Sequence, residues 1–383
     1  MKKILLLVAL CFFGEGFSQK IMDSIYSKKL NATRDISITL PSSYKKDKNK
    51  AYPVLIVLDG DYMQSAFDGA LRYSNYWDDL PELIVVGVYQ NQKDERYEDS
   101  EIDEVTGLPH GKGAQFFEFL GGELLPYIES KYKTLPFRII AGHDVTAAFS
   151  NFYLYKDNPI FNAYINISPE LTLDMEKNVA SRLSNIPRPT FFYLAVADGD
   201  NNKTKEKIAT LDTNIKELKN PAVSYKFDEI KNANHYSVVL HAIPNALYHI
   251  FSSYQPISNA EYKEKIVTLT SGYVDYLKNK YETSEKALGF KVSGRYSDFQ
   301  AIEAAIVKNK ANNEFELLAQ LANKMFPKTM LGEYYLARYY EALGDAKRAA
   351  KSYQTAFTLP EVGDLTKDMM LEKADELKGQ IKK

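Results

Sequence analysis

Short, continuously apolar runs limit the fold of this chain more than any other feature of its sequence. Residues 54–58 and 84–88 are apolar throughout and rich in β-branched side chains. Such runs are typical of strands buried on both faces of a parallel sheet. Further strand patterns occupy residues 138–142, 163–167, 190–196 and 223–227, with apolar residues at helix spacing between them.

Strands that alternate with helices predict an α/β domain with one mostly parallel sheet covered on both faces. The pattern extends from about Asp35 to Ser252. Residues 36–40 alternate between apolar and polar side chains, which favours an edge strand at the start of this region.

The character of the sequence changes after Pro256, where strand patterns end and helical patterns continue. Residues 331–360 match the spacing of a tetratricopeptide repeat, and residues 297–327 resemble a weaker preceding unit. The matching positions are Leu336, Ala337, Tyr340, Gly344, Asp345, Ala349, Tyr353, Ala356 and Pro360. We therefore expect an α/β domain over residues 19–255 and a small all-α domain over residues 256–383. The concave face of such helix pairs would bind a protein or peptide partner; the simpler interpretation is a helical tail that packs on the first domain.

The N-terminus has the pattern of a signal peptide over residues 1–18. Two lysines precede an apolar stretch at residues 4–13, which is too short to span a bilayer. Gly16 and Ser18 are the small residues that a signal peptidase reads, so cleavage is expected after Ser18. Cys11, the only cysteine, follows Leu10 rather than a small residue, which argues against a lipoprotein. We expect a periplasmic or extracellular protein without disulfides or a transmembrane segment in the mature chain.

Charge and residue spacing narrow the class of ligand. The net charge is −2 and no basic run is present, which argues against nucleic acid as a partner. No cluster of His, Asp and Glu has the spacing of metal ligands, so neither a metal nor another cofactor is predicted.

Residues 139–149 are the most informative stretch for function. An apolar strand pattern leads into a tight turn and then a helix, and the small residues Gly142 and Thr146 lie two positions before and after Asp144. This is the pattern of a nucleophile elbow, in which a strained turn exposes one side chain above the sheet. The usual form is Gly-x-Ser-x-Gly, so Asp144 occupies the position of the serine.

Several other segments share their order and spacing with one family. They are Leu58-Asp59-Gly60-Asp61, the strand at 84–88 followed by Asn91, Arg96 and Asp99, the helix around 123–128, and Ser168-Pro169. Together with the elbow they resemble the putative esterase family, which includes esterase D and the enterochelin esterases. The resemblance implies an α/β-hydrolase fold, ester hydrolysis by a serine nucleophile without a cofactor, and a helical, tetratricopeptide-like extension found on some members.

The resemblance also places the other residues of a catalytic site. The acid of the triad matches Asp200, with Asp198 as the alternative in the same turn, and the base matches His235. The chain order of Asp144, Asp200 and His235 agrees with the order of nucleophile, acid and base on this fold. The oxyanion hole would use two backbone N–H groups. These would belong to Val145 and to either Asp61 or Tyr62.

Asp144 changes the expected chemistry, because a carboxylate cannot replace a serine hydroxyl in ester hydrolysis. Two carboxylates beside His235 would also raise its pKa and weaken it as a base. We favour an esterase-like scaffold that is impaired in serine-type hydrolysis and retained for binding a small ester-like ligand or a partner. One alternative is a hydrolase that uses Asp144 as the nucleophile on an epoxide or alkyl halide, as related folds do. Another is ester hydrolysis by a water held between Asp144 and His235.

Overall fold

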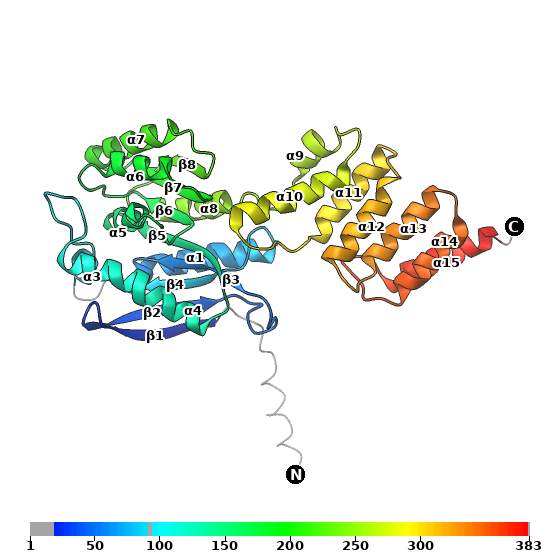
Figure 1. Ribbon diagram of the computed structural model, residues 1–383, viewed down its shortest axis with the longest axis horizontal. Helices are drawn as coiled ribbons and strands as arrows, with labels where there is room; N and C mark the ends of the chain where they lie inside the picture. The colour runs from blue at the N-terminus through cyan, green and yellow to red at the C-terminus, as the bar shows by residue number, and fades with distance from the viewer. Residues whose placement is uncertain (1–18, 91–93, 382–383) are drawn as a thin grey trace, which may run out of the picture. The chain divides into compact units, whose positions relative to one another are not determined.

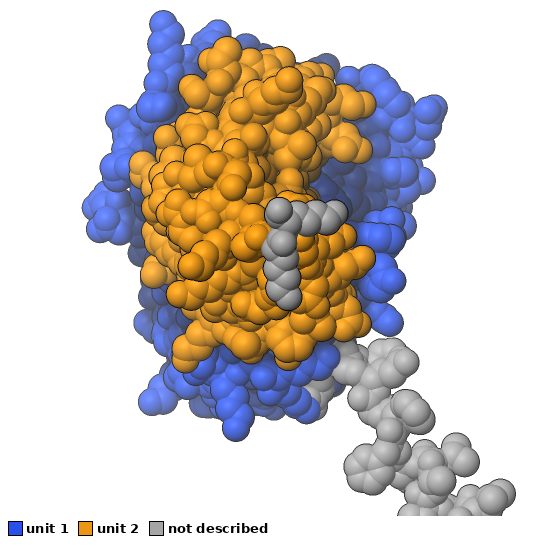
Figure 2. Space-filling model, turned by 90° about the vertical axis from the view of Figure 1, so that its right-hand side faces the viewer, with its two compact units in different colours: residues 1–252 blue, residues 253–383 orange. Residues whose placement is uncertain are grey.

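The computed structural model describes residues 19–90 and 94–381. The chain divides between Ser252 and Ser253 into two compact units. Figure 2 shows the two units in different colours. The predicted signal peptide and Asn91 lie outside the described residues. No helix in the described ranges is long and apolar enough to cross a bilayer.

The first unit contains an eight-stranded sheet in the order β1-β2-β4-β3-β5-β6-β7-β8. The strands β3 to β8 run parallel, whereas β2 is antiparallel to both β1 and β4. Their bounds are β1 Gln19–Ser27, β2 Ala32–Leu40, β3 Tyr52–Val57, β4 Ile84–Val88, β5 Thr134–His143, β6 Ala163–Ile167, β7 Thr190–Ala197 and β8 Val223–Ile230. This is an α/β-hydrolase fold, and the prediction of a mostly parallel sheet is confirmed.

Helices cover both faces of the sheet (Figure 1). Apolar side chains of α3, α4, α6 and α7 form one core with the sheet, whereas α1 and α8 pack together against β4 and β7. The helices are α1 Gly60–Tyr76, α2 Glu95–Asp99, α3 Gly111–Phe119, α4 Leu125–Lys131, α5 Val145–Ser150, α6 Met175–Ser184, α7 Asn202–Lys216 and α8 Val238–Ile250. The connections after β3 and β5 bring the turn before α1 and the turn before α5 to the same end of the sheet, since parallel strands end on one side.

The expectation of an edge strand at residues 36–40 is wrong. β2 lies inside the sheet, and the edge is β1, which the sequence pattern did not predict. The polar residues Ser37 and Thr39 are buried because their hydroxyls bond to side chains of α1, Thr39 Oγ1 to Asp68 at 3.0 Å and Ser37 to Gln64. An apolar–polar alternation therefore does not mark a solvent-facing strand when a polar helix face covers it.

In the described part of the second unit the regular elements are helices, joined by turns and by one isolated β-bridge between Val362 and Leu365. Its helices are α9 Asn259–Glu261, α10 Tyr273–Leu288, α11 Tyr296–Lys308, α12 Glu314–Met325, α13 Leu331–Ala342, α14 Ala346–Phe357 and α15 Lys367–Ile381. From α12 to α15 each helix packs on the next, with Tyr335 and Tyr353 fully buried between them. The tetratricopeptide assignment and the peptide-binding role of this unit stay predictions.

Candidate functional site

Asp144 lies at the turn between β5 and α5, with φ 60° and ψ −123°. These angles match the first central position of a type II′ turn, which is strained for most L-residues. A Cβ at Gly142 would lie 2.6 Å from the backbone of Thr146 and Ala147, so the strand and the helix meet without room for a side chain. The Asp144 side chain is 21% exposed. Both features are those of a nucleophile elbow, as the sequence predicted.

Thr146 occupies the last small position of the elbow and uses its hydroxyl to hold the turn. Its Oγ1 lies 2.6 Å from Asp59 Oδ2 and 2.9 Å from the His143 carbonyl, and it accepts from the His143 N–H at 3.1 Å. Asp59 precedes α1 at φ 54°, and its side chain is fully buried. Thr146 therefore ties the elbow to the turn after β3.

Arg96 of α2 reaches the elbow and contacts Asp144. Its Nη1 lies 3.3 Å from Asp144 Oδ2, while Nη2 donates to the His143 carbonyl at 2.9 Å and Nε donates to Asp59 Oδ1 at 2.7 Å. Burial acts to lower the pKa of Arg96. The hydrogen bond to Asp59 and the negative charge of Asp59 together outweigh burial, so the net shift of this pKa is upward. The guanidinium is thus a permanent positive charge held against the Asp144 carboxylate.

His235 and Asp200 form a hydrogen-bonded pair beside the elbow. His235 Nδ1 lies 2.7 Å from Asp200 Oδ1, and the same carboxylate accepts from Ser168 Oγ at 2.6 Å and from the Ala197 N–H at 2.9 Å. Asp198 instead accepts from two backbone N–H groups, those of residues 232 and 233. Of the two carboxylates in the predicted turn, Asp200 is therefore the partner of the histidine.

The surroundings of His235 and Asp200 raise the pKa of the histidine and lower the pKa of the aspartate. The Asp200 hydrogen bond raises the pKa of His235; burial opposes this shift, and the charge of Asp144 adds to it. Burial works to raise the pKa of Asp200, but the hydrogen bonds from His235 and Ser168 produce a net decrease. Both shifts favour an imidazolium facing a carboxylate, as expected from two carboxylates near one histidine.

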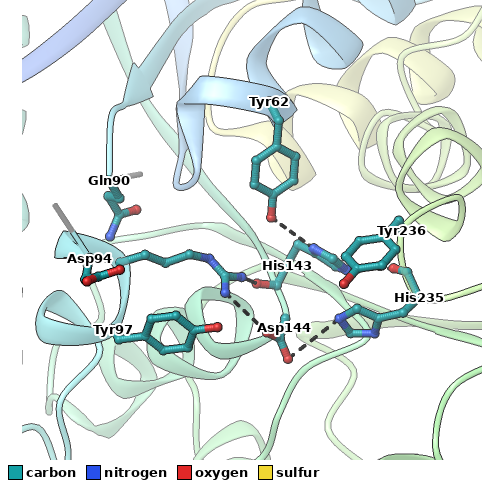
Figure 3. A pocket seen from close by; sticks show the side chains of 9 residues that line it. Tyr62, Gln90, Asp94, Tyr97, His143, Asp144, His235 and Tyr236 are labelled. Atoms are coloured by element: carbon teal, nitrogen blue, oxygen red, sulfur yellow. Dashed lines mark hydrogen bonds and ion pairs between the residues drawn. The ribbon is translucent and has the colours of Figure 1, made fainter. Parts of the chain in front are cut away.

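His235 lies within ion-pair distance of Asp144 (Figure 3) but does not hydrogen-bond to it. His235 Nε2 lies 3.8 Å from Asp144 Oδ1, which is longer than a hydrogen bond. The structure therefore brings Asp144, Asp200 and His235 together in the arrangement of a triad. The hydrogen bond that would join the nucleophile position, Asp144, to the base, His235, is not formed.

Three comparisons with known proteins bear on this geometry. The model of a family described as "Putative esterase" matches residues 27–173. A crystal structure of an uncharacterised protein from Capnocytophaga ochracea is 30% identical with a TM-score of 0.83, and the match covers 94% of this chain and 100% of that one. The chain belongs to the putative esterase family. No curated protein matches it.

Two more distant structures share the fold. An IroE-like serine hydrolase from Shewanella oneidensis is 18% identical with a TM-score of 0.63, covering 79% of this chain and 98% of that one. The BES protein from Bacillus cereus is 24% identical with a TM-score of 0.52, covering 60% of this chain and 93% of that one. The α/β-hydrolase fold of this family member is therefore shared with a serine hydrolase, whereas its own elbow carries an aspartate.

His143, which precedes the elbow centre in this esterase-like chain, connects two walls of the site. Its Nε2 lies 2.9 Å from the His235 carbonyl and therefore donates, which leaves Nδ1 as an acceptor 2.9 Å from the Tyr62 hydroxyl. Burial, followed by the proximity of His235, lowers the pKa of His143. A neutral His143 thus holds the His235 loop against α1.

One of the three backbone donors considered for an oxyanion hole already has a partner in the structure. The Tyr62 N–H donates to the Asp59 carbonyl at 3.2 Å inside the turn, which argues against Tyr62 as the second donor. Tyr62 instead faces the site with its phenol ring (Figure 3). Neither Asp61 nor Val145 lines either of the two cavities that open beside Asp144. The oxyanion role of Asp61 and Val145 stays a prediction.

Two adjoining cavities meet at Asp144 and His235. The larger, of about 370 Å³, is lined by Tyr62, Gln90, Asp94, Arg96, Tyr97, His143, Asp144, His235 and Tyr236. The smaller, of about 260 Å³, is lined by Glu170, Leu171, Lys203, Lys207 and neighbouring residues of the turn before α7. Sequence reasoning did not place Arg96, Tyr97 or Tyr236 in the site. Arg96 appeared only as part of the family resemblance, and no spacing rule pointed to the two tyrosines.

Proposed function

We propose that this esterase-like protein binds a ligand in the pocket around Asp144 and does not hydrolyse esters by the serine route. One observation carries the proposal: the elbow presents a carboxylate that is paired with Arg96 at 3.3 Å. A carboxylate that attacked an ester would form an anhydride and be expelled more readily than the alkoxide. The Arg96 guanidinium stabilises the negative charge of Asp144 and weakens it further as a nucleophile.

The state of His235 supports the same conclusion. A general base must be neutral to accept a proton, and its best pKa lies near the working pH. The Asp200 hydrogen bond and the charge of Asp144 both raise the pKa of His235. Replacing a neutral serine by Asp144 therefore removes the serine nucleophile and adds a negative charge that helps to raise the pKa of its base.

The test compares Asp144→Ser with Asp144→Ala on p-nitrophenyl acetate and butyrate. With the Asp200–His235 pair in place at 2.7 Å, a serine hydroxyl would again have a base beside it, so Asp144→Ser should exceed Asp144→Ala by at least about tenfold in kcat/KM. The double variant Asp144→Ser/His235→Ala is the matched control and should lose that gain. A stripped triad enzyme keeps an acceleration of roughly 10³–10⁴ over water, so weak turnover by the wild type is no evidence of a catalytic Asp144.

One outcome contradicts the proposal. A wild type as fast as Asp144→Ser would show that ester hydrolysis proceeds without the hydroxyl. Equal rates for Asp144→Ser and Asp144→Ala would show that the site has lost more than the serine, which favours the binding function.

A second candidate is a hydrolase that uses Asp144 to attack a saturated carbon. The observation that favours it is the 3.8 Å gap between His235 Nε2 and Asp144 Oδ1, because a water near His235 could attack an alkyl ester formed on Asp144. In that reaction the carboxylate displaces a halide or opens an epoxide, and water then cleaves the ester and restores Asp144. Mass spectrometry of the His235→Gln variant after incubation with 1-bromobutane or styrene oxide decides this case. An unmodified Asp144 peptide excludes it.

A further inference from the structure

Hydrogen-bond donors and an acceptor lie side by side on the floor of the larger cavity. Asp144 offers carboxylate oxygens and Arg96 offers N–H groups, while His235 Nε2 carries an N–H when the imidazole is protonated. The 3.8 Å from His235 Nε2 to Asp144 Oδ1 is too long for a direct bond, but a ligand oxygen placed to one side of the line that joins the two atoms can lie about 2.8 Å from each. A hydroxyl group is the ligand group that donates and accepts at a single atom. The gap therefore suits a hydroxyl that donates to Asp144 and accepts from His235.

Charges of both signs line the two cavities. The positive groups are Arg96, Lys203 and Lys207, with His235 when it is protonated, and the negative groups are Asp94, Asp144, Glu170 and Asp200. At the floor these charges are paired within the protein, Arg96 with Asp59 at 2.7 Å and His235 with Asp200 at 2.7 Å. A charged ligand of either sign would meet a like charge and would disrupt an existing pair. The pocket therefore favours an uncharged ligand.

Exposed aromatic rings flank this polar floor. Tyr97 of α2 and Tyr236 of the loop after β8 both line the larger cavity and are 66% and 78% exposed (Figure 3). A tyrosine ring offers an apolar face and a polar tip, so it contacts ligands that are apolar on one side and hydrogen-bonded on another. Pyranose rings have this character, because their C–H groups form an apolar face and their hydroxyls lie at the edge.

We propose that the pocket binds a neutral saccharide, with one hydroxyl bridging His235 and Asp144 and with sugar C–H groups against Tyr97 and Tyr236. This inference rests on the proposed binding function. It explains why a carboxylate at the elbow is useful: Asp144 accepts from sugar hydroxyls through charge-assisted hydrogen bonds that a serine could not provide.

The experiment is isothermal titration calorimetry on the full-length protein with a fixed panel of non-ester probes. The neutral probes are methyl β-D-glucopyranoside, methyl β-D-xylopyranoside, cellobiose and xylobiose. D-glucuronate supplies a negative charge and D-glucosamine a positive one. At least one neutral probe should bind with a Kd below about 10 mM and at least about tenfold more tightly than either charged sugar.

Variants separate the proposed contacts from a general effect on the fold. Asp144→Ala and Tyr236→Ala should each weaken the neutral probe by about tenfold or more, since each removes a direct contact. Tyr73→Ala is the matched control, because Tyr73 is 68% exposed and lies on α1 outside both cavities; it should leave the affinity unchanged.

The saccharide proposal is overturned by any of three results. These are no binding of a neutral probe up to about 10 mM, tighter binding of glucuronate or glucosamine, or an Asp144→Ala variant that binds as the wild type does. The proposed function fails in a different way, if the wild type hydrolyses esters as fast as Asp144→Ser does. Because the probes contain no ester, that failure leaves the binding measurements unaffected.

Discussion

Asp59→Asn should destabilise the α/β unit by about 3–5 kcal/mol, the usual cost of removing one partner of a buried ion pair. The Asp59 carboxylate is fully buried and lies within hydrogen-bond distance of Arg96 Nε at 2.7 Å, Thr146 Oγ1 at 2.6 Å and the Tyr62 hydroxyl at 3.1 Å. An asparagine keeps the shape and tolerates the φ of 54°, but it has one acceptor oxygen and places an NH₂ group against these donors.

The size of this destabilisation follows from the buried groups that Asp59→Asn leaves without a hydrogen-bond partner. Hydrogen bonds to a charged group contribute about 1.5–3 kcal/mol each, and bonds that share one carboxylate are not additive. The Arg96 side chain is 12% exposed and would keep only Asp144 at 3.3 Å as an ionic partner. The loss of a single buried partner therefore sets the scale, rather than the sum of the separate bonds.

Urea unfolding followed by circular dichroism measures the change in the free energy of unfolding. Asp174→Asn is a matched control, because Asp174 also precedes a helix at positive φ, 52°, but its side chain is 53% exposed and pairs only with Lys177. The control should change stability by less than about 1 kcal/mol. If Asp59→Asn falls within about 1 kcal/mol of Asp174→Asn, the turn after β3 does not depend on this ion pair and the argument is wrong.

Three further predictions follow from the site and the N-terminus. Histidine NMR should give His235 a pKa above its ordinary 6.5. Because the folded value is raised, the stability that His235 contributes is full below pH 6.5 and is lost as the pH rises through the folded pKa, and Asp200→Asn should remove most of it; a midpoint at or below 6.5 contradicts this. Gly142→Ala should cost about 1–3 kcal/mol or more, because its Cβ would meet backbone atoms at 2.6 Å, whereas Gly69→Ala, in open space on α1, should be neutral or stabilising; equal effects in urea unfolding would refute the tight crossing. We also expect export, so N-terminal sequencing of protein from the native host should begin near Gln19, and an N-terminus with its initiator methionine in the cytoplasm is the contrary result.

The elbow could be predicted because its signal is local, whereas the acid and the base were predicted from the family resemblance. Gly142 and Thr146 mark the strained turn through their size, and Asp200 and His235 match family positions that follow strands indicated by the apolar pattern. The geometry also selects Asp200 over Asp198, a choice that the Asp-Gly-Asp turn left open in the sequence.

The remaining features depend on contacts between distant segments. Arg96 meets Asp144 across 48 positions of the chain, and no local pattern indicates which carboxylate a loop arginine will reach. The strand β1 was missed because its apolar residues do not keep to one face: Met22 and Tyr26 are exposed, whereas Ser27 is buried. Ser37 and Thr39 misled the assignment of β2 because a helix supplies their hydrogen-bond partners.

The backbone angles of Asp144 also bear on how such a site changes in evolution. The codons GAU and GAC for aspartate differ from the serine codons AGU and AGC at their first and second bases. A stepwise path between them passes through asparagine or glycine. These are the residues that accept a positive φ most readily, and the elbow requires a φ of 60°. The turn therefore admits each intermediate, so one lineage can pass between a serine and an aspartate centre in either direction without losing the fold.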